Sequence, residues 1–283
     1  MRHGFLYPEI EGEANFIQLP YRLASKEISS EQVIGELERQ ITEETHTIIV
    51  SSENFSHQKS FRYLAEIFQD YELHAVIYLR RQDLWLESWY NQHVKWPWIS
   101  KYSGSSFTCF RKNYRDFFWL NYEDLLNRIE EVIPRERLYV KTLDDNGLVD
   151  SFTDFLQHCG INIGWLKVEG LHHNRSLSSA RIDILRRIDI YNIQAESRLK
   201  VHSALRKMKI NEDNGKARFF TDRQRRDFIK KYSSSNRNVA RRYFAREKLF
   251  SEYVPDGVRP VFLNNKVAYQ KYIPELLKRV AEE

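Results

Sequence analysis

Two adjacent arginines, with a serine eight residues after the first of them, are the side chains best suited to chemistry. Arg80 and Arg81 follow the apolar run AVIYL, residues 75–79, and Ser88 lies in the helix-like segment that comes next. A guanidinium at a strand end and the free N–H groups of a following helix both favour an anion. We expect Arg80 and Ser88 to contact one phosphate, with Arg81 beside them in a less defined role.

Ser88 is predicted to face inward. On a helix that starts near Asp83, positions 84, 85, 88, 89 and 92 form one stripe of Leu, Trp, Ser, Trp and Gln. The Ser88 hydroxyl either bonds back to the carbonyl at position 84 or meets a ligand above the sheet, and the nearby arginine favours the ligand.

The elements that must position these residues alternate between strands and helices, which predicts an α/β fold with a parallel sheet and right-handed crossovers. Ligands of such sheets bind at the carboxyl ends of the strands. We expect one domain over 1–283 that is mainly helical from about 178, with a boundary near Gly170 as the alternative. The predicted elements are a strand at 46–51, a helix at 56–71, a strand at 73–80, a helix from 83, an irregular excursion at 96–118, a helix at 121–133, a strand at 137–143 and a helix at 148–161 that stops at Gly160.

Bulk composition excludes several classes of protein. The 283 residues are 42% hydrophobic, enough for a sizeable core, and no run of 18 apolar residues or secretory signal occurs, so we expect a cytoplasmic chain without a membrane span. Cys109 and Cys159 lack metal or disulfide spacing and are predicted to be packing residues. The pair His172 and His173 has no third ligand at useful spacing, so we expect no metal.

Positive charge is concentrated late in the chain. Residues 181–246 hold 19 Lys or Arg against 7 Asp or Glu, whereas the net charge of the whole chain is only +5. Such a block meets phosphates, sulfated or acidic glycans, nucleic acid or only solvent. Nucleic acid is disfavoured because the aromatic residues stand at helix-core spacings rather than between exposed cations. They are Phe219, Phe220, Phe228, Tyr232, Tyr243 and Phe244.

Several segments together resemble the sulfotransferases that use 3′-phosphoadenosine 5′-phosphosulfate, in the form typical of bacterial sulfotransferase-like proteins. The resemblance covers nearly the whole chain, and it depends on the order and spacing of the segments rather than on any one motif. The segments are YLRRQDLWLESWYNQ, IIVSSENF, LVDSFTDFLQHCGI, HHNRSLSS and SSSNRNVARRYFAREKLF.

The resemblance implies a P-loop-like parallel sheet and transfer of a sulfuryl group to a hydroxyl, most simply that of a carbohydrate. By position, Arg80 and Ser88 would hold the 3′-phosphate of the donor, and Arg81 is the less certain neighbour. A sulfotransferase commonly uses a carboxylate or a histidine to take the hydroxyl proton. Glu53, after the strand at 46–51, is the candidate base, and an exposed turn or a pairing with Arg81 is the alternative; Glu11 and Glu13 are further candidates.

The family begins with a strand and a Lys-Thr-Gly-Thr-Thr-like loop that holds the 5′-phosphosulfate. None of the ten glycines stands in such a pattern. RHGFLYP is similar to what normally follows this loop, so we expect the first βα unit, about 25–30 residues, to be missing and transfer by the chain as written to be weak or absent. The rival hypotheses are a binding protein whose region 181–246 meets a polyanion, and a purely structural role.

Overall fold

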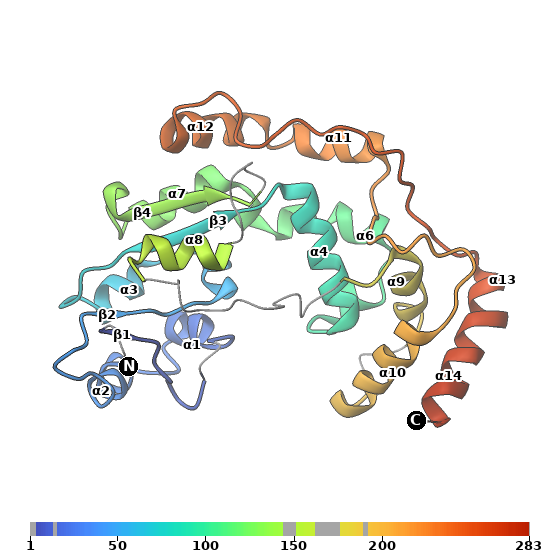
Figure 1. Ribbon diagram of the computed structural model, residues 1–283, viewed down its shortest axis with the longest axis horizontal. Helices are drawn as coiled ribbons and strands as arrows, with labels where there is room; N and C mark the ends of the chain where they lie inside the picture. Colours follow the sequence, from blue (N-terminus) through green and yellow to red (C-terminus); the bar gives the residue numbers. More distant parts are fainter. Residues whose placement is uncertain (1–3, 14–15, 144–150, 162–175, 189–191, 283) are drawn as a thin grey trace. The chain divides into compact units, whose positions relative to one another are not determined.

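The structure, a computed structural model, describes all residues except 1–3, 14–15, 144–150, 162–175, 189–191 and 283 (Figure 1). Contacts along the chain divide it into two compact units, and each unit is assembled from three separate stretches. Unit 1 comprises Met1–Leu79, Phe117–Lys167 and Ser234–Phe250, and unit 2 comprises Arg80–Asp116, Val168–Ser233 and Ser251–Glu283.

Unit 1 holds the strands. β1 (Phe5–Leu6) pairs in parallel with β2 (Thr47–Ile48), and β3 (Ala75–Leu79) pairs in parallel with β4 (Leu138–Thr142). The predicted α/β class and the parallel direction of the strands are therefore confirmed. Among the described residues the strands form two small sheets rather than the predicted single sheet.

The larger core of unit 1 lies against β3 and β4. Two helices supply most of it, α7 (Tyr122–Glu130) and α12 (Ser233–Phe244). The amide of Asn121 caps the start of α7, where its side-chain oxygen accepts from the backbone N–H of Asp124. The buried residues are Phe61, Leu79, Tyr122, Leu125, Leu126, Ile129, Ile133, Val140, Val239, Ala240 and Leu249.

A second core of unit 1 is built from the first helices of the chain, which the sequence analysis did not assign. α1 (Leu19–Ser25) and α2 (Ser30–Glu38) bury a shared apolar surface, and α2 starts with a capping box between Ser29 and Gln32. Residues of α3 (Arg62–Ile67) pack against it. This core contains Ile10, Phe16, Leu19, Leu23, Ile28, Val33 and Leu37.

The remaining elements of unit 1 are short. They are η1 (Glu53–Phe55), η3 (Phe118–Leu120), η4 (Arg135–Arg137) and α8 (Ser151–His158). The predicted stop at Gly160 is confirmed, because this residue has a φ of +72° and its N–H bonds the carbonyl of Gln157 at 3.0 Å.

Unit 2 begins with α4 (Gln82–Lys95), which follows β3 after only two residues, as predicted. The segment 96–118 is not the irregular excursion that was expected. It contains α5 (Ser100–Ser103), α6 (Phe107–Lys112) and η2 (Tyr114–Asp116), because Phe107 and Phe110 pack their rings against Tyr90 of α4. On this segment Cys109 is exposed, which contradicts its predicted packing role.

The late part of unit 2 is helical in every element that is described. Its helices are α9 (Ser179–Leu185), α10 (Ala195–Lys207), α11 (Asp222–Lys230), α13 (Asn265–Val267), the π-helical turn η6 (Ala268–Tyr272) and α14 (Ile273–Glu282). Phe219, Phe220, Phe228 and Tyr232 are buried, as their spacing predicted. Gly170 lies outside the described residues, and no helix that is described is long and apolar enough to cross a bilayer.

Candidate functional site

The predicted anion-binding residues lie just before α4, in the case of Arg80 and Arg81, and within it, in the case of Ser88. The face of α4 that is buried is not the predicted one. The buried face holds Asp83, Leu86, Glu87 and Tyr90. The predicted inward stripe, on which Ser88 lies, is half-buried, so Ser88 is less buried than the residues of this other face. The apolar pattern of the sequence did not indicate the buried face, because two carboxylates lie on it.

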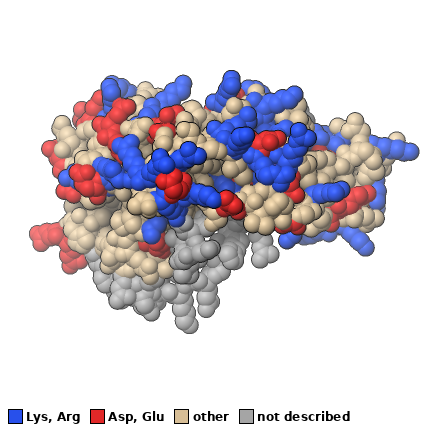
Figure 2. All heavy atoms as spheres, turned by 90° about the horizontal axis from the view of Figure 1, so that it is seen from above, with Lys and Arg blue, Asp and Glu red and all other residues tan. Residues whose placement is uncertain are grey.

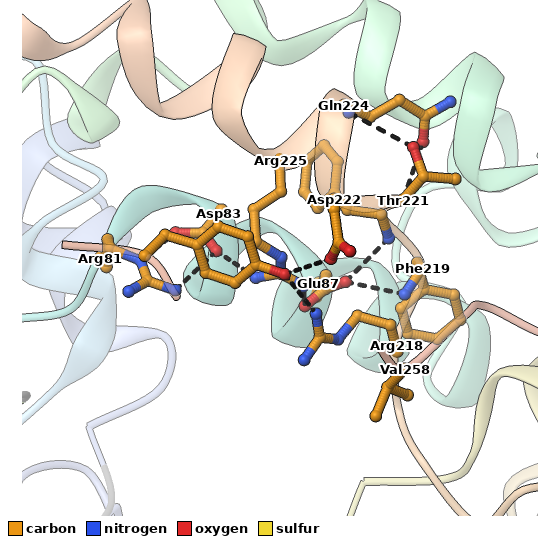
Figure 3. Close-up of polar contacts among 12 residues, drawn as sticks. Arg81, Asp83, Glu87, Arg218, Phe219, Thr221, Asp222, Gln224, Arg225 and Val258 are labelled. Carbon is orange, nitrogen blue, oxygen red and sulfur yellow. Dashed lines mark hydrogen bonds and ion pairs between the residues drawn. The ribbon is translucent and has the colours of Figure 1, made fainter. Parts of the chain in front are cut away.

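Those carboxylates are held by one buried arginine of α11, Arg225 (Figure 3). The Arg225 side chain and that of Asp83 are both 0% exposed, and their charged groups form a close ion pair. The second terminal nitrogen of Arg225 donates to Glu87 at 2.6 Å. Asp83 and Glu87 stand one helical turn apart, so a single guanidinium fork spans both of them.

The backbone satisfies the other oxygen of Glu87. It accepts from the N–H groups of Phe219 and Phe220, at 2.7 and 2.9 Å. These two residues precede α11, whose start is closed by a capping box between Thr221 and Gln224. Glu87 thereby fixes the chain that leads into α11 to the middle of α4.

Arg81 completes the buried cluster from the start of α4. Its guanidinium donates to the two Asp83 carboxylate oxygens at 2.7 and 3.1 Å, and it stacks 5.4 Å from the Tyr253 ring centroid. Arg225 approaches the same ring, also at 5.4 Å. Arg81 is thus occupied by contacts within unit 2, which favours a structural role over direct anion binding.

Tyr253 also connects the cluster to solvent-facing residues. Its hydroxyl donates to Asp222 and accepts from Arg218 at 3.1 Å. Arg218 in turn pairs with Asp256. Figure 3 shows Asp222 and Arg225 of α11, and Arg218 ahead of that helix, converging with Asp83 and Glu87 of α4.

The cluster is suited to holding elements together rather than to proton transfer. Burial, the largest influence, lowers the pKa of Arg225, but the charges of Glu87 and Asp83 outweigh it and hold that pKa above its ordinary value. A guanidinium that stays charged supplies no proton to a reaction. We define these residues, Arg81, Asp83, Glu87, Arg225 and Tyr253, as the α4 clasp.

Neither of the two residues predicted to contact the phosphate is fully buried. Arg80 is half-buried and directly precedes the helix start, and Ser88 is half-buried within α4. Both belong to unit 2, whereas Glu53 is an exposed residue at the start of η1 in unit 1. The positions of His172, His173, Asn174 and Arg175 lie outside the described residues.

The two further candidate bases are engaged locally. Glu11 forms an ion pair with Arg22, and a Glu13 oxygen accepts from the backbone N–H of Gln18 at 3.3 Å. Glu11 is therefore a poorer candidate for a base than the exposed Glu53, because its charge already has a partner.

Two buried histidines of unit 2 escaped the sequence analysis. Burial lowers the pKa of His93 to about 4, and His93 Nδ1 has no hydrogen-bond partner among the described residues. Burial lowers the pKa of His202 to about 4 as well, helped by the nearby positive charges of Lys95 and Arg206. Both rings are neutral at pH 7. Among the residues that the structure describes, no three His, Cys, Asp or Glu side chains gather as a metal site.

Comparison with known proteins adds one relative. A protein of Archaeoglobus fulgidus described as uncharacterized is 33% identical over 178 residues, which are 62% of this chain and 47% of that protein. The chain thus spans about half the length of this relative. No protein-family model and no solved structure matches the chain.

Proposed function

We propose that this protein is a sulfotransferase-like protein in which Arg80 and Ser88 hold the 3′-phosphate of 3′-phosphoadenosine 5′-phosphosulfate. The acceptor hydroxyl oxygen would attack the sulfur of the donor and form a new S–O bond, while the bond from sulfur to the 5′-phosphate oxygen breaks and 3′-phosphoadenosine 5′-phosphate leaves. A general base would take up the hydroxyl proton. The chemistry of the start of α4 carries the proposal. An arginine, a hydroxyl and the N–H groups of a helix start suit a dianion.

The exposure of the two residues supports the proposal. Arg80 and Ser88 are each half-buried, so a phosphate can reach them without unfolding α4. The Arg81 guanidinium pairs with Asp83, so a direct contact of Arg81 with the phosphate would have to be made beside that ion pair. The 5′-phosphosulfate loop has no counterpart in the sequence, so the proposal covers the 3′-phosphate half of the donor site.

The α4 clasp supports the proposal indirectly. A site that binds one phosphate needs its two ligating side chains at a fixed separation. Arg80 and Ser88 flank Asp83 and Glu87, the two carboxylates that Arg225 holds to α11. We infer that the clasp keeps the start of α4 rigid and acts through positioning, without touching the donor.

Titration calorimetry of the full chain with 3′-phosphoadenosine 5′-phosphate tests the proposal. We expect Arg80→Ala to weaken binding about 10- to 100-fold, because a charge-assisted hydrogen-bonding partner is lost, and Ser88→Ala to weaken it less. Arg115→Ala, which removes an exposed cation of the same unit, is the matched control and should leave affinity within about twofold.

A second ligand makes the test specific for the 3′-phosphate. Adenosine 5′-monophosphate lacks that group, so the parent protein should bind it more weakly and Arg80→Ala should bind both nucleotides alike. Equal affinity of the parent and Arg80→Ala for 3′-phosphoadenosine 5′-phosphate would refute the assignment of Arg80. Absence of binding by the parent protein would refute the proposed function.

The rival proposal, a polyanion-binding protein that uses residues 181–246, is weakened by how many of its arginines are already engaged. Arg225 is buried in the clasp, Arg187 contacts Asp183 and Arg242 contacts Glu130. Arg225 and Arg187 are thereby withdrawn from solvent, whereas Arg242 stays exposed beside Glu130. Figure 2 nevertheless shows Lys and Arg scattered among Asp and Glu on the face seen from above.

A further inference from the structure

Three tryptophans of unit 2 form one connected and partly exposed aromatic surface. Trp85 and Trp89 stand one turn apart on α4 with their rings stacked, 5.0 Å between centroids and 29° between planes. Trp98 joins them at 5.5 Å from Trp89 and is 57% exposed. We name these three residues the tryptophan surface.

A buried histidine supports the tryptophan surface from below. His93 meets both Trp89 and Trp98 edge-on, at 5.0 and 5.4 Å, and is itself buried. Its ring is neutral at pH 7, because burial lowers its pKa to about 4. The two indole rings are therefore fixed by an aromatic contact on one side while part of their surface stays open to solvent.

Such an arrangement needs an explanation, since Trp usually buries most of its large apolar area. The half-buried Gln92 lies on the same stripe of α4 as Trp85 and Trp89, and it adds an amide that both donates and accepts hydrogen bonds. None of these four side chains carries a charge. Flat aromatic faces with a few hydrogen-bonding groups are typical of ligand sites rather than of packed cores.

We propose that the tryptophan surface binds the pyranose rings of a neutral carbohydrate chain. The C–H groups on one face of a sugar ring suit the electron-rich face of an indole, and the sugar hydroxyls suit the Gln92 amide. A protein partner is less suitable, because a specific interface buries about 800 Å² on each side and three indole rings provide much less. The four side chains themselves offer no charge to pair with an anionic ligand.

The inference deepens the proposed function, and it rests on that function only where the carbohydrate is taken as the acceptor. Ser88 lies between Trp85 and Trp89 in the sequence of α4. Gln92 lies one turn beyond Ser88, roughly 6 Å along the helix axis. A sugar held on the tryptophan surface would therefore lie close to the donor phosphate that Arg80 and Ser88 are proposed to hold.

Titration calorimetry of the full chain with three neutral oligosaccharides, cellohexaose, chitohexaose and maltohexaose, tests the inference. We expect at least one of these to bind, and Trp98→Ala to weaken that binding about tenfold, since one stacking contact is lost. Trp98 is exposed, so this variant should keep its fold. Trp96→Leu is the matched control, because the Trp96 ring packs against His202 instead, and it should stay within about twofold of the parent.

The outcomes separate the two proposals. Sugar binding that Trp98→Ala weakens supports the inference even if 3′-phosphoadenosine 5′-phosphate does not bind, in which case only the proposed function fails. No binding of any of the three oligosaccharides at millimolar concentration overturns the inference. It is also overturned if Trp98→Ala and Trp85→Ala weaken nucleotide binding alone, because the surface then stacks the adenine base.

Discussion

Replacement of Arg225 by Met should destabilise unit 2 by about 3 kcal/mol, because two buried carboxylates lose their shared partner. Removing one side of a buried ion pair generally costs 3–5 kcal/mol. We expect the lower end, since Asp83 keeps the Arg81 guanidinium and Glu87 keeps two backbone N–H donors. Arg226→Met is the matched control. Arg226 is the next residue of α11 and its side chain is exposed, so this substitution should change the free energy of unfolding by no more than about 0.5 kcal/mol.

Equilibrium unfolding in urea measures this difference, and tryptophan fluorescence reports on α4 directly because Trp85 and Trp89 lie in it. One further signature distinguishes a lost charge from lost side-chain volume. The added substitution Glu87→Gln should recover part of the stability, since it removes one of the orphaned charges.

A deficit below about 1 kcal/mol, or one that the added Glu87→Gln does not reduce, would refute the reasoning that Arg225 is held by charge. Calorimetry of the same variant with 3′-phosphoadenosine 5′-phosphate then tests the positioning role. If the clasp only aligns the start of α4, affinity for that nucleotide falls in Arg225→Met while the preference over adenosine 5′-monophosphate persists.

Two further predictions concern the other buried polar groups of unit 2. In the folded protein His93 and His202 have pKa values of about 4, against an ordinary value of 6.5. The unfolded chain therefore binds more protons than the folded one between these two pH values. The free energy of unfolding should fall as the pH drops from about 6.5 to 4, by up to about 3 kcal/mol for each histidine. Urea titrations across that range should give a flatter pH dependence for a variant with both histidines changed to Phe. Asp183 pairs with Arg187 at 3.0 Å and accepts from the backbone N–H of Leu263 at 2.8 Å, so Asp183→Ala should cost about 3 kcal/mol. Limited proteolysis should then cut near Leu263 sooner than in the parent, and an unchanged digestion pattern would argue against this anchoring.

The parts of the fold that follow local rules could be predicted from the sequence. The β3–α4 succession and the helix stop at Gly160 depend on neighbours a few residues away, and both were predicted. The helices of the first forty residues were not assigned, although Ser29 and Gln32 form a capping box of the kind that marks a helix start.

The buried face of α4 could not be predicted in the same way. Apolar periodicity assigns Asp83 and Glu87 to the solvent side, since an isolated buried carboxylate is costly. Their burial depends on Arg225, which is 142 residues away from Asp83 in the chain. Acidic side chains one turn apart in an otherwise aromatic helix are a signal for such a partner, but they do not indicate which of the many late arginines supplies it.

That separation in sequence also bears on how the protein is made. α4 leaves the ribosome with two carboxylates on the face that will become its interior, and their partner is still about 140 residues away. At 5–20 residues per second the delay is roughly 7–30 s. During that time the carboxylates lack Arg225, although α6, which packs on Tyr90 of α4, follows within about 20 residues. The clasp therefore makes the completion of unit 2 a late event in synthesis, and a nascent chain that stops before α11 exposes an acidic and aromatic helix to chaperones or to other chains.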